Sequence, residues 1–210
     1  MPSDRLFIPP RIGDSTIGDI VFRQDRRAFS NLRKRRGGEV KVGRHIAVNV
    51  GGACYGNGKP WARAAAGVYF GPWSRHNFSE EVEDGRQTNQ RAEIYAAIIA
   101  LDKIKEFLDE EKLNTSLVVV VTDSRYVVDA MTNFIYRWQD NGWRNRKRSE
   151  VVNREDFEEL DELVDELEDD YEVFVKFWWV PKEDNEDADE MARQAAGFYD
   201  DDDDDDDDSD

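Results

Sequence analysis

The sequence predicts an α/β domain built on a mixed five-stranded sheet flanked by helices. The run from Ser116 to Thr122 (SLVVVVT) has no polar alternation, which is typical of a central strand covered on both faces. Strand and helix patterns follow one another in the order β-β-β-α-β-α-α-β-α. Three early strands in this order predict a meander, and the strands that alternate with helices predict parallel neighbours.

The elements before the valine run are short apolar segments closed by turn residues, followed by one long helix. We expect strands at 45–50, closed by Gly51-Gly52, at 64–70, closed by Gly71-Pro72, and at 76–82, which is polar enough to be an edge strand. The range 88–112 places its apolar residues on one helical face. After the valine run we expect helices at 124–134, 156–167 and 185–196, and a strand at 172–180.

Composition excludes several classes of protein. Hydrophobic residues make up 39% of the 210, which is compatible with a packed core and excludes wholesale disorder. No apolar run is long enough for a membrane span, and the N-terminus lacks the apolar segment of a secretion signal. Cys54 is the single cysteine and there are two histidines, so neither an internal disulfide nor a zinc site is expected. We therefore expect an intracellular protein of the nucleus or cytoplasm with no membrane partner.

The formal net charge of −18 is divided unevenly among three regions. Residues 1–43 form a basic N-terminal extension that contains the run Arg33–Arg36, residues 44–199 form the domain, and residues 200–210 hold ten aspartates. Like charges at this density predict a disordered tail. The tail is interpreted either as a solvating segment or as a nucleic-acid mimic that screens the protein's own basic surface. Basic protein partners are a further possibility for it.

Three carboxylates occupy conspicuous positions at the ends of predicted elements. Asp123 follows the valine strand, Glu93 lies early in the long helix among small and apolar residues, and Asp189 lies in the first turn of the last helix. Each of these acids taken alone is typical of a helix cap or a solvated surface. Together, at one edge of a sheet, they predict a site for a hard cation such as Mg²⁺.

Several motifs together resemble the eukaryotic type 1 ribonuclease H domain over residues 44–198. They are Gly85–Glu93 (GRQTNQRAE), Thr122–Ser124 (TDS), Asn141–Trp143 (NGW), Val152–Phe157 (VNREDF) and Asn185–Arg193 (NEDADEMAR). The resemblance implies a ribonuclease H-like fold. It also implies recognition of RNA/DNA hybrid and cleavage of the RNA strand with two Mg²⁺ or Mn²⁺ ions.

The resemblance also shows where this chain departs from the family. Glu93, Asp123 and Asp189 match three of the family's four metal-binding, catalytic acids, but Gly51 stands where the fourth, an aspartate, is expected. The loop that carries a histidine in the family is reduced here to Lys182-Glu183-Asp184. Both departures imply weakened metal binding and a cleavage activity that is lost or much reduced, as in a pseudoenzyme.

The nucleic-acid-binding residues of the family are better preserved. The resemblance assigns the minor groove to Asn57, Asn89 and Gln90, and a DNA-phosphate pocket to Arg86, Thr88 and Asn153. It assigns a basic, aromatic surface along the DNA strand to Phe134, Trp138, Trp143, Arg144 and Arg146, where Phe134 replaces the usual tryptophan of the family and Arg146 replaces a serine. The alternative for the last group is a solvated loop beside two core tryptophans.

Three functions remain open from the sequence. The leading one is a domain that recognises RNA/DNA hybrid or a related duplex with a degenerate metal site. The second is an active hybrid endoribonuclease that tolerates Gly51, and the third is a protein-interaction module on the same scaffold.

Overall fold

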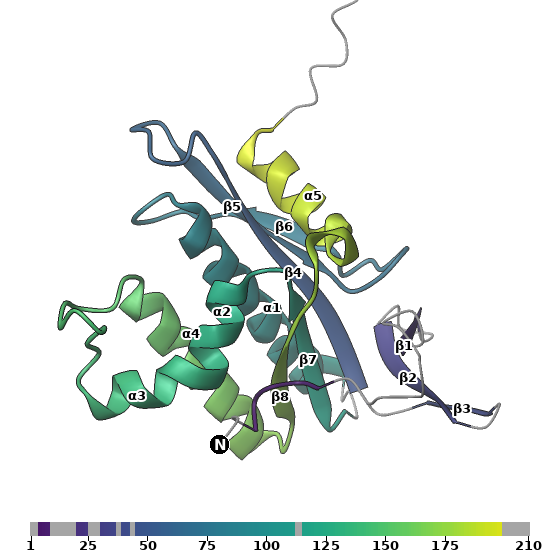
Figure 1. Cartoon of the computed structure of the whole chain (residues 1–210). Coiled ribbons are helices and arrows are strands. Elements are labelled where there is room, and N and C mark those ends of the chain that lie inside the picture. The colour runs from purple at the N-terminus through teal and green to yellow at the C-terminus, as the bar shows by residue number, and fades with distance from the viewer. Residues whose placement is uncertain are drawn as a thin grey trace, which may run out of the picture.

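The computed structural model describes residues 4–8, 20–24, 30–36, 39–42, 45–111 and 115–198 (Figure 1). The predicted acidic tail at 200–210 lies outside these residues, and so does part of the predicted extension at 1–43. Three short antiparallel strands in the extension form a small sheet in the order β1-β2-β3, and β2 contacts β4. Their bounds are β1 (Ile20–Gln24), β2 (Ser30–Arg36) and β3 (Glu39–Val42).

The main sheet has five strands in the order β6-β5-β4-β7-β8. They are β4 (His45–Tyr55), β5 (Arg63–Tyr69), β6 (Phe78–Glu81), β7 (Leu117–Thr122) and β8 (Phe174–Trp179). Strands β4, β5 and β6 pair antiparallel as a meander, whereas β7 lies parallel to both β4 and β8. The predicted mixed five-stranded sheet is therefore confirmed.

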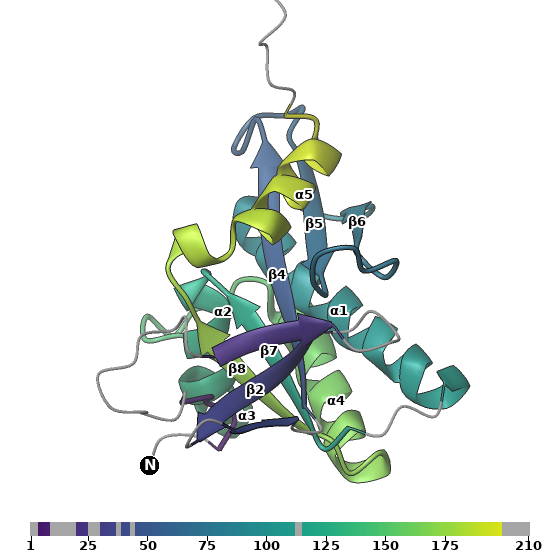
Figure 2. The same cartoon turned by 90° about the vertical axis from the view of Figure 1, so that its right-hand side faces the viewer.

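In the described ranges, five α-helices accompany the sheet, and they cover both of its faces. Their bounds are α1 (Asn89–Glu111), α2 (Arg125–Asp129), α3 (Ile135–Asp140), α4 (Arg154–Asp170) and α5 (Glu186–Ala196). Figure 2 shows α5 in front of β4 and β5, with α1 and α4 behind the sheet. A π-helical turn at Ala130–Phe134 joins α2 to α3, so the helix predicted at 124–134 continues to Asp140.

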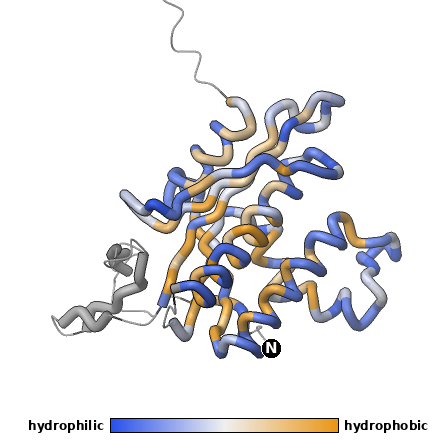
Figure 3. The backbone as a smooth tube through the Cα atoms, turned by 180° about the vertical axis from the view of Figure 1, so that it is seen from behind, coloured by the Kyte–Doolittle hydropathy of each residue, from blue (hydrophilic) through white to orange (hydrophobic). Residues whose placement is uncertain are grey.

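Strand β7 explains why its sequence lacks polar alternation. Val118 and Val120 pack into the main core with α1 and α4, whereas Val119 and Val121 pack on the opposite face with Trp178. Figure 3 shows the most hydrophobic residues gathered in the central strands and along the helices that face them. Both faces of a central parallel strand are buried away from water, so polar residues are not favoured on either face.

Close approach of two helices to the sheet depends on glycines in β4 and β5. A Cβ atom on Gly52 would lie 2.3 Å from the backbone nitrogen of Glu93, and one on Gly67 would lie 2.3 Å from the carbonyl oxygen of Ala188. Helix α1 therefore rests directly on the backbone of β4, and α5 rests on that of β5. The predicted turn at Gly51-Gly52 is wrong, because β4 runs through both residues to Tyr55.

Residues 4–8 were predicted to lie in the extension, but they pack against the domain. The amide of Phe7 donates to Phe177 and the amide of Phe177 donates to Arg5, which adds a short parallel stretch beside β8. The Arg5 guanidinium is buried and forms ion pairs with Asp161 and Asp165 of α4. Of the helices in the described ranges, none combines the length and hydrophobicity that crossing a membrane requires.

Candidate functional site

The edge where β4 and β7 separate forms a notch in the sheet. Their parallel pairing ends at Asn49 and Val121, after which β4 continues beside β5 alone. The side-chain amide of Asn185 fills the notch, because its Nδ2 donates to the carbonyl oxygen of Val50 at 3.0 Å and to Oδ1 of Asp123 at 2.8 Å. Asn185 is only 1% exposed. Asp123 is thus held at the end of β7 by a buried amide.

Glu93 reaches the same region from α1, on the face opposite α5. Its Oε2 atom is buried without a hydrogen-bond partner. Burial, followed by the negative charge of Asp123 and a smaller contribution from Asp189, raises the pKa of Glu93 to about 8, although the Gly52 amide and Lys182 oppose the shift. Glu93 is therefore close enough to both Asp123 and Asp189 to interact with each of them electrostatically.

Asp189 approaches from the other face of the sheet, in the first turn of α5. Its Oδ2 forms an ion pair with Nζ of Lys182 at 3.2 Å. Lys182 belongs to the short 3-10 turn Lys182–Asp184 that connects β8 to α5. A lysine ammonium thus lies beside the acid cluster formed by Glu93, Asp123 and Asp189.

Gly51 lies on β4 between the elements that carry these acids. It is not among the residues with positive φ, so its backbone conformation is open to other amino acids. A Cβ atom on Gly51 would point to α5, 3.0 Å from the backbone nitrogen of Asp189 and 3.1 Å from the carbonyl carbon of Ala188. A side chain at this position would therefore enter the acid cluster. Gly51 itself supplies no ligand.

The side chains present do not match the requirements of two divalent cations. In the described ranges, no three His, Cys, Asp or Glu residues converge as a group that could hold a metal ion. Asp123 accepts from the Asn185 amide, Asp189 is paired with Lys182, and burial favours the neutral form of Glu93. Hard cations such as Mg²⁺ are held by carboxylate oxygens. Gly51 adds no carboxylate to this cluster.

A second group of residues forms an anion-compatible pocket beside the start of α4. The pocket has a volume of about 710 Å³, and its polar lining consists of Asn153, the arginines Arg86, Arg91 and Arg154, and the acids Glu150, Glu155, Asp156 and Glu158. Arg91 pairs with Asp156, and Arg154 pairs with Glu150 and Glu158, so Arg86 is the cation without an ion pair among the lining residues that the structure describes. Asn153 adopts a left-handed conformation with φ of 58°, and its buried Nδ2 forms no well-aligned hydrogen bond, although the side chain lies close enough to the Tyr126 hydroxyl to interact with it. Thr88 is not in the pocket lining, and its Oγ1 instead accepts from the Arg91 amide at the start of α1. An amide donor with only this weak partner, beside the exposed guanidinium of Arg86, is suited to a phosphate oxygen.

Three side-chain amides share the surface near the start of α1. Asn57 lies in the turn between β4 and β5, where Gly56 and Gly58 have positive φ. The Oδ1 atom of Asn57 accepts from the backbone amide of Asn89 at 3.4 Å. Asn89 and Gln90 are both exposed, so the predicted minor-groove residues lie together and face solvent.

The basic, aromatic segment between α3 and α4 combines a packed interior with an exposed rim. Trp143 was assigned to nucleic-acid binding, but the structure buries it to 7% exposure against Trp138, which leaves its ring unavailable to a ligand. Phe134 and Trp138 are half-buried and line a cavity of about 460 Å³. Arg144 and Arg146 are exposed at its rim.

The arginines of this segment are available for anions. Asn141 Oδ1 accepts from the Arg144 amide at 2.7 Å, and Asn145 Oδ1 accepts from the Lys147 amide at 2.9 Å, so the loop satisfies its own backbone donors. In the part of the chain that the structure describes, no carboxylate forms an ion pair with Arg144, Arg146 or Arg148. These cations can therefore pair with phosphates.

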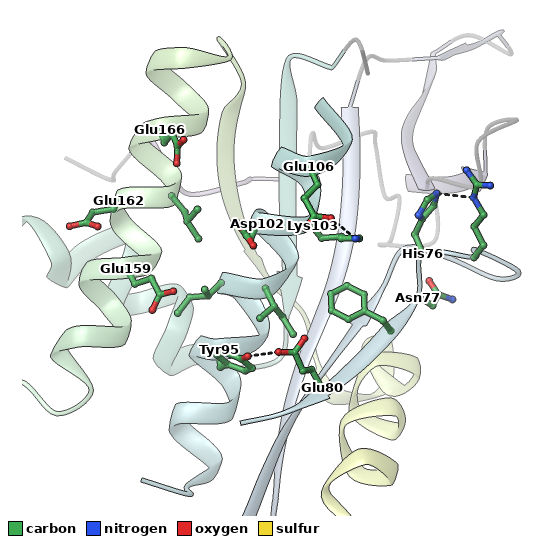
Figure 4. Close-up of a pocket in the computed structure, with 15 residues that line it drawn as sticks. His76, Asn77, Glu80, Tyr95, Asp102, Lys103, Glu106, Glu159, Glu162 and Glu166 are labelled. Atoms are coloured by element: carbon green, nitrogen blue, oxygen red, sulfur yellow. Dashed lines mark hydrogen bonds and ion pairs between the residues drawn. The ribbon is translucent and has the colours of Figure 1, made fainter. Parts of the chain in front are cut away.

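A groove of about 830 Å³ between β6, α1 and α4 has the opposite character (Figure 4). Its charged lining is mostly acidic: Glu80, Asp102, Glu106, Glu159, Glu162 and Glu166, with Arg75 and Lys103 as counter-charges. Its six acids outnumber these two cations, whereas four acids and three arginines line the Asn153 pocket, so the groove is the less favourable of the two for a phosphate.

Two residues of the site, Asn185 and Lys182, were not predicted from the sequence to have a functional role. Asn185 was read only as the beginning of the last helix, and Lys182 only as part of a shortened loop. A usable signal was present for Lys182, because it is the single cation between Pro181 and Glu190 in a stretch dominated by acids (KEDNEDADE). The role of Asn185 depends on the separation of β4 from β7 and had no local signal.

Comparison with known proteins gives a consistent result. The profile of the family RNase H matches residues 44–197. Ribonuclease H1 of Rattus norvegicus is 38% identical over 159 residues, which cover 74% of this chain and 51% of that protein, so this chain spans about half the length of that relative. Ribonuclease H of Afipia carboxidovorans is 31% identical over 71% of this chain and 91% of that protein. The crystal structure of LC11-RNase H1 in complex with RNA/DNA hybrid shares the fold, with a TM-score of 0.50 and 24% identity over 71% of this chain and 95% of that chain.

Proposed function

Because the chain belongs to the RNase H family, we propose that it recognises RNA/DNA hybrid and that its cleavage of the RNA strand is lost or much reduced. The resemblance predicted from the sequence motifs is confirmed by the family match. Hybrid is the ligand in the LC11-RNase H1 complex. This chain spans about half the length of Ribonuclease H1, so the activity of that longer protein is only proposed for this chain.

The pocket at Asn153 is the observation that carries hybrid recognition. The Nδ2 of Asn153 has no well-aligned acceptor in the protein and only the Tyr126 hydroxyl near it, so a phosphate oxygen in the pocket would be a stronger partner. Arg86 lines the same pocket, so a phosphate there would gain a charged and a neutral donor. The exposed amides of Asn57 and Asn89 add groups suited to ribose hydroxyls in a minor groove.

The acid cluster supports the second half of the proposal. Gly51 contributes no carboxylate, and Lys182 already neutralises Asp189. A two-ion mechanism places one cation on the attacking oxygen and one on the leaving oxygen. With one bridging ligand missing, occupancy of at least one ion falls, and cleavage falls with it.

Binding tests the first half through its dependence on salt. The affinity for a labelled hybrid, measured by fluorescence anisotropy, is expected to fall with a slope of about 0.9 in log salt for each phosphate neutralised. Reversal of Arg144, Arg146 and Arg148 to Glu should abolish binding. The matched control Lys103→Glu, in the acidic groove, should leave it unchanged. Unchanged affinity in the triple variant would favour the protein-interaction module.

An active endoribonuclease is a second candidate, since Glu93 interacts electrostatically with both Asp123 and Asp189. Incubation of the hybrid with Mg²⁺ and, separately, with Mn²⁺ distinguishes the two candidates. We expect little or no RNA cleavage with either ion. Rapid cleavage that Asp123→Asn abolishes would establish the active enzyme instead.

A further inference from the structure

The carboxylates of the acid cluster are stabilised when a positive charge lies beside them. Glu93 approaches from α1, Asp123 from the end of β7 and Asp189 from α5, and Glu93 interacts with both of the others. Oε2 of Glu93 is buried and unpaired. Carboxylates gathered in a partly desolvated place repel one another, and they also repel an incoming phosphate. A cation beside the charged carboxylates of Asp123 and Asp189 would favour the approach of a nucleic-acid phosphate.

Lys182 provides a positive charge at this place. Its Nζ lies 3.2 Å from Oδ2 of Asp189. One ammonium therefore lies within ion-pair distance of an acid of the cluster, where a metal ion would otherwise balance the charge.

The short connection between β8 and α5 fixes this lysine in position. The Asp184 amide donates to the carbonyl oxygen of Pro181 at 3.0 Å, and the Asn185 amide donates to that of Lys182 at 2.9 Å. The side chain of Asn185 is in turn anchored to β4 and Asp123. Lys182 is therefore attached to the same buried residue that orients Asp123.

The ammonium is also accessible from outside the cluster. The side chain of Lys182 is 64% exposed, whereas that of Asp189 is 20% exposed. An ammonium has three donors, so Nζ can hold Asp189 with one and offer the others to a phosphate oxygen. These are the two tasks that a divalent cation performs between carboxylates and a nucleic-acid backbone.

We propose that the ammonium of Lys182 takes the place of a divalent cation at the acid cluster, so that the chain accepts a nucleic-acid phosphate there without Mg²⁺. The metal-substituting half of this inference stands on the cluster alone, and the phosphate half rests on the proposed hybrid binding. Removal of the ammonium should turn the cluster into a weak Mg²⁺ site.

Mg²⁺ binding by the full chain, without nucleic acid, tests the first half. Titrations are followed by calorimetry and by the thermal unfolding midpoint for the wild type, Lys182→Gln, Lys182→Arg and Lys182→Gln combined with Asp189→Asn. Lys182→Gln is expected to bind Mg²⁺ about tenfold more tightly than the wild type, because a nearby competing charge has been removed. Lys182→Arg should resemble the wild type, and the double variant should lose the gain. Weak binding to the ten terminal aspartates is common to all four proteins.

Hybrid binding in EDTA and in Mg²⁺ tests the second half. The wild-type affinity should be the same in both, whereas Lys182→Gln should lose about tenfold in EDTA and recover in Mg²⁺. Lys103→Gln, at an ion pair in the acidic groove, is the matched control and should show neither effect. The inference is overturned if Lys182→Gln binds Mg²⁺ no more tightly than the wild type, or if wild-type hybrid binding requires Mg²⁺. Absence of hybrid binding in every protein would refute the proposed function, and the titration without nucleic acid would still decide the role of Lys182 as a metal substitute.

Discussion

Gly51→Asp is the substitution that most directly examines the geometry of the acid cluster. The new Cβ would lie 3.0 Å from the backbone nitrogen of Asp189 and 3.2 Å from the carbonyl oxygen of Ala188. Both contacts are tight and both involve backbone, so the first turn of α5 has to move by a few tenths of an ångström. No cost arises from backbone strain, because Gly51 has no positive φ.

The expected loss of stability follows from these contacts and from the added charge. Overpacking of this kind costs about 1–3 kcal/mol, and a fourth carboxylate beside Glu93, Asp123 and Asp189 adds about 1 kcal/mol of repulsion in EDTA. For a chain of this size, such a loss lowers the unfolding midpoint by roughly 5–15 °C. Mg²⁺ at about 100 times its dissociation constant should restore about 2.7 kcal/mol through binding to the native state.

The assay combines thermal unfolding with hybrid cleavage, each in EDTA and in Mg²⁺. We expect Gly51→Asp to be less stable than the wild type in EDTA, to gain more stability from Mg²⁺, and to cleave the RNA strand slowly. Adding Lys182→Gln should increase both the gain and the cleavage. Gly51→Asp combined with Asp123→Asn is the control and should be inactive.

Two results would refute this reasoning. If Mg²⁺ stabilises Gly51→Asp no more than the wild type, the new carboxylate does not join Glu93, Asp123 and Asp189. If Gly51→Asp binds both hybrid and Mg²⁺ but never cleaves, those three acids are not in catalytic positions.

Three further predictions concern pH, the tail and the N-terminal segment. In EDTA the free energy of unfolding of the wild type should fall by no more than about 4–5 kcal/mol as pH rises from about 4.5 to 8. The reason is that the unfolded chain releases the Glu93 proton near pH 4.5, whereas the folded chain holds it up to about pH 8. Denaturant unfolding across this range should show no such loss in Glu93→Gln. Truncation after Phe198 removes ten aspartates and should tighten hybrid binding at low salt but not at high salt, and equal affinities at low salt would rule out competition by the tail. Arg5→Ala leaves the buried carboxylate of Asp161 without its cation and should cost about 3–5 kcal/mol in urea unfolding, with partial recovery when Asp161→Asn is added.

The sequence predicted those features that local pattern determines. Strand β7 was readable because both of its faces are apolar, and Glu93, Asp123 and Asp189 were found because acids stood among small or apolar neighbours at element ends. In the structure Glu93 interacts electrostatically with both Asp123 and Asp189, and their role in metal binding stays a prediction. Motif resemblance pointed to Asn153 as a candidate for phosphate binding, although the burial of its Nδ2 depends on the path of the chain.

Other features depend on contacts between distant segments and were not readable. A glycine pair is a common turn signal, and a turn was predicted at Gly51-Gly52. In the structure β4 continues through both residues, and position 52 requires glycine because the backbone of α1 lies against it. Trp143 lies in a basic stretch yet packs on Trp138, because the loop turns back at this point with positive φ. The ion pair of Lys182 with Asp189 arises only when the connection to α5 folds over the cluster.

The hydrogen bonds between Arg5–Phe7 and β8 have a consequence for how the chain avoids self-association. Strand β8 borders the five-stranded sheet, and its outer edge would otherwise offer free backbone donors and acceptors to another molecule. Residues 5–7 occupy part of that edge, and Phe7 covers Trp178 with ring centroids 5.4 Å apart. A fragment that began at residue 44, as the family match would lead one to design it, would expose both the edge and the indole. Residues 5–7 therefore leave less of this edge free for strand pairing with another molecule, which is a route to aggregation.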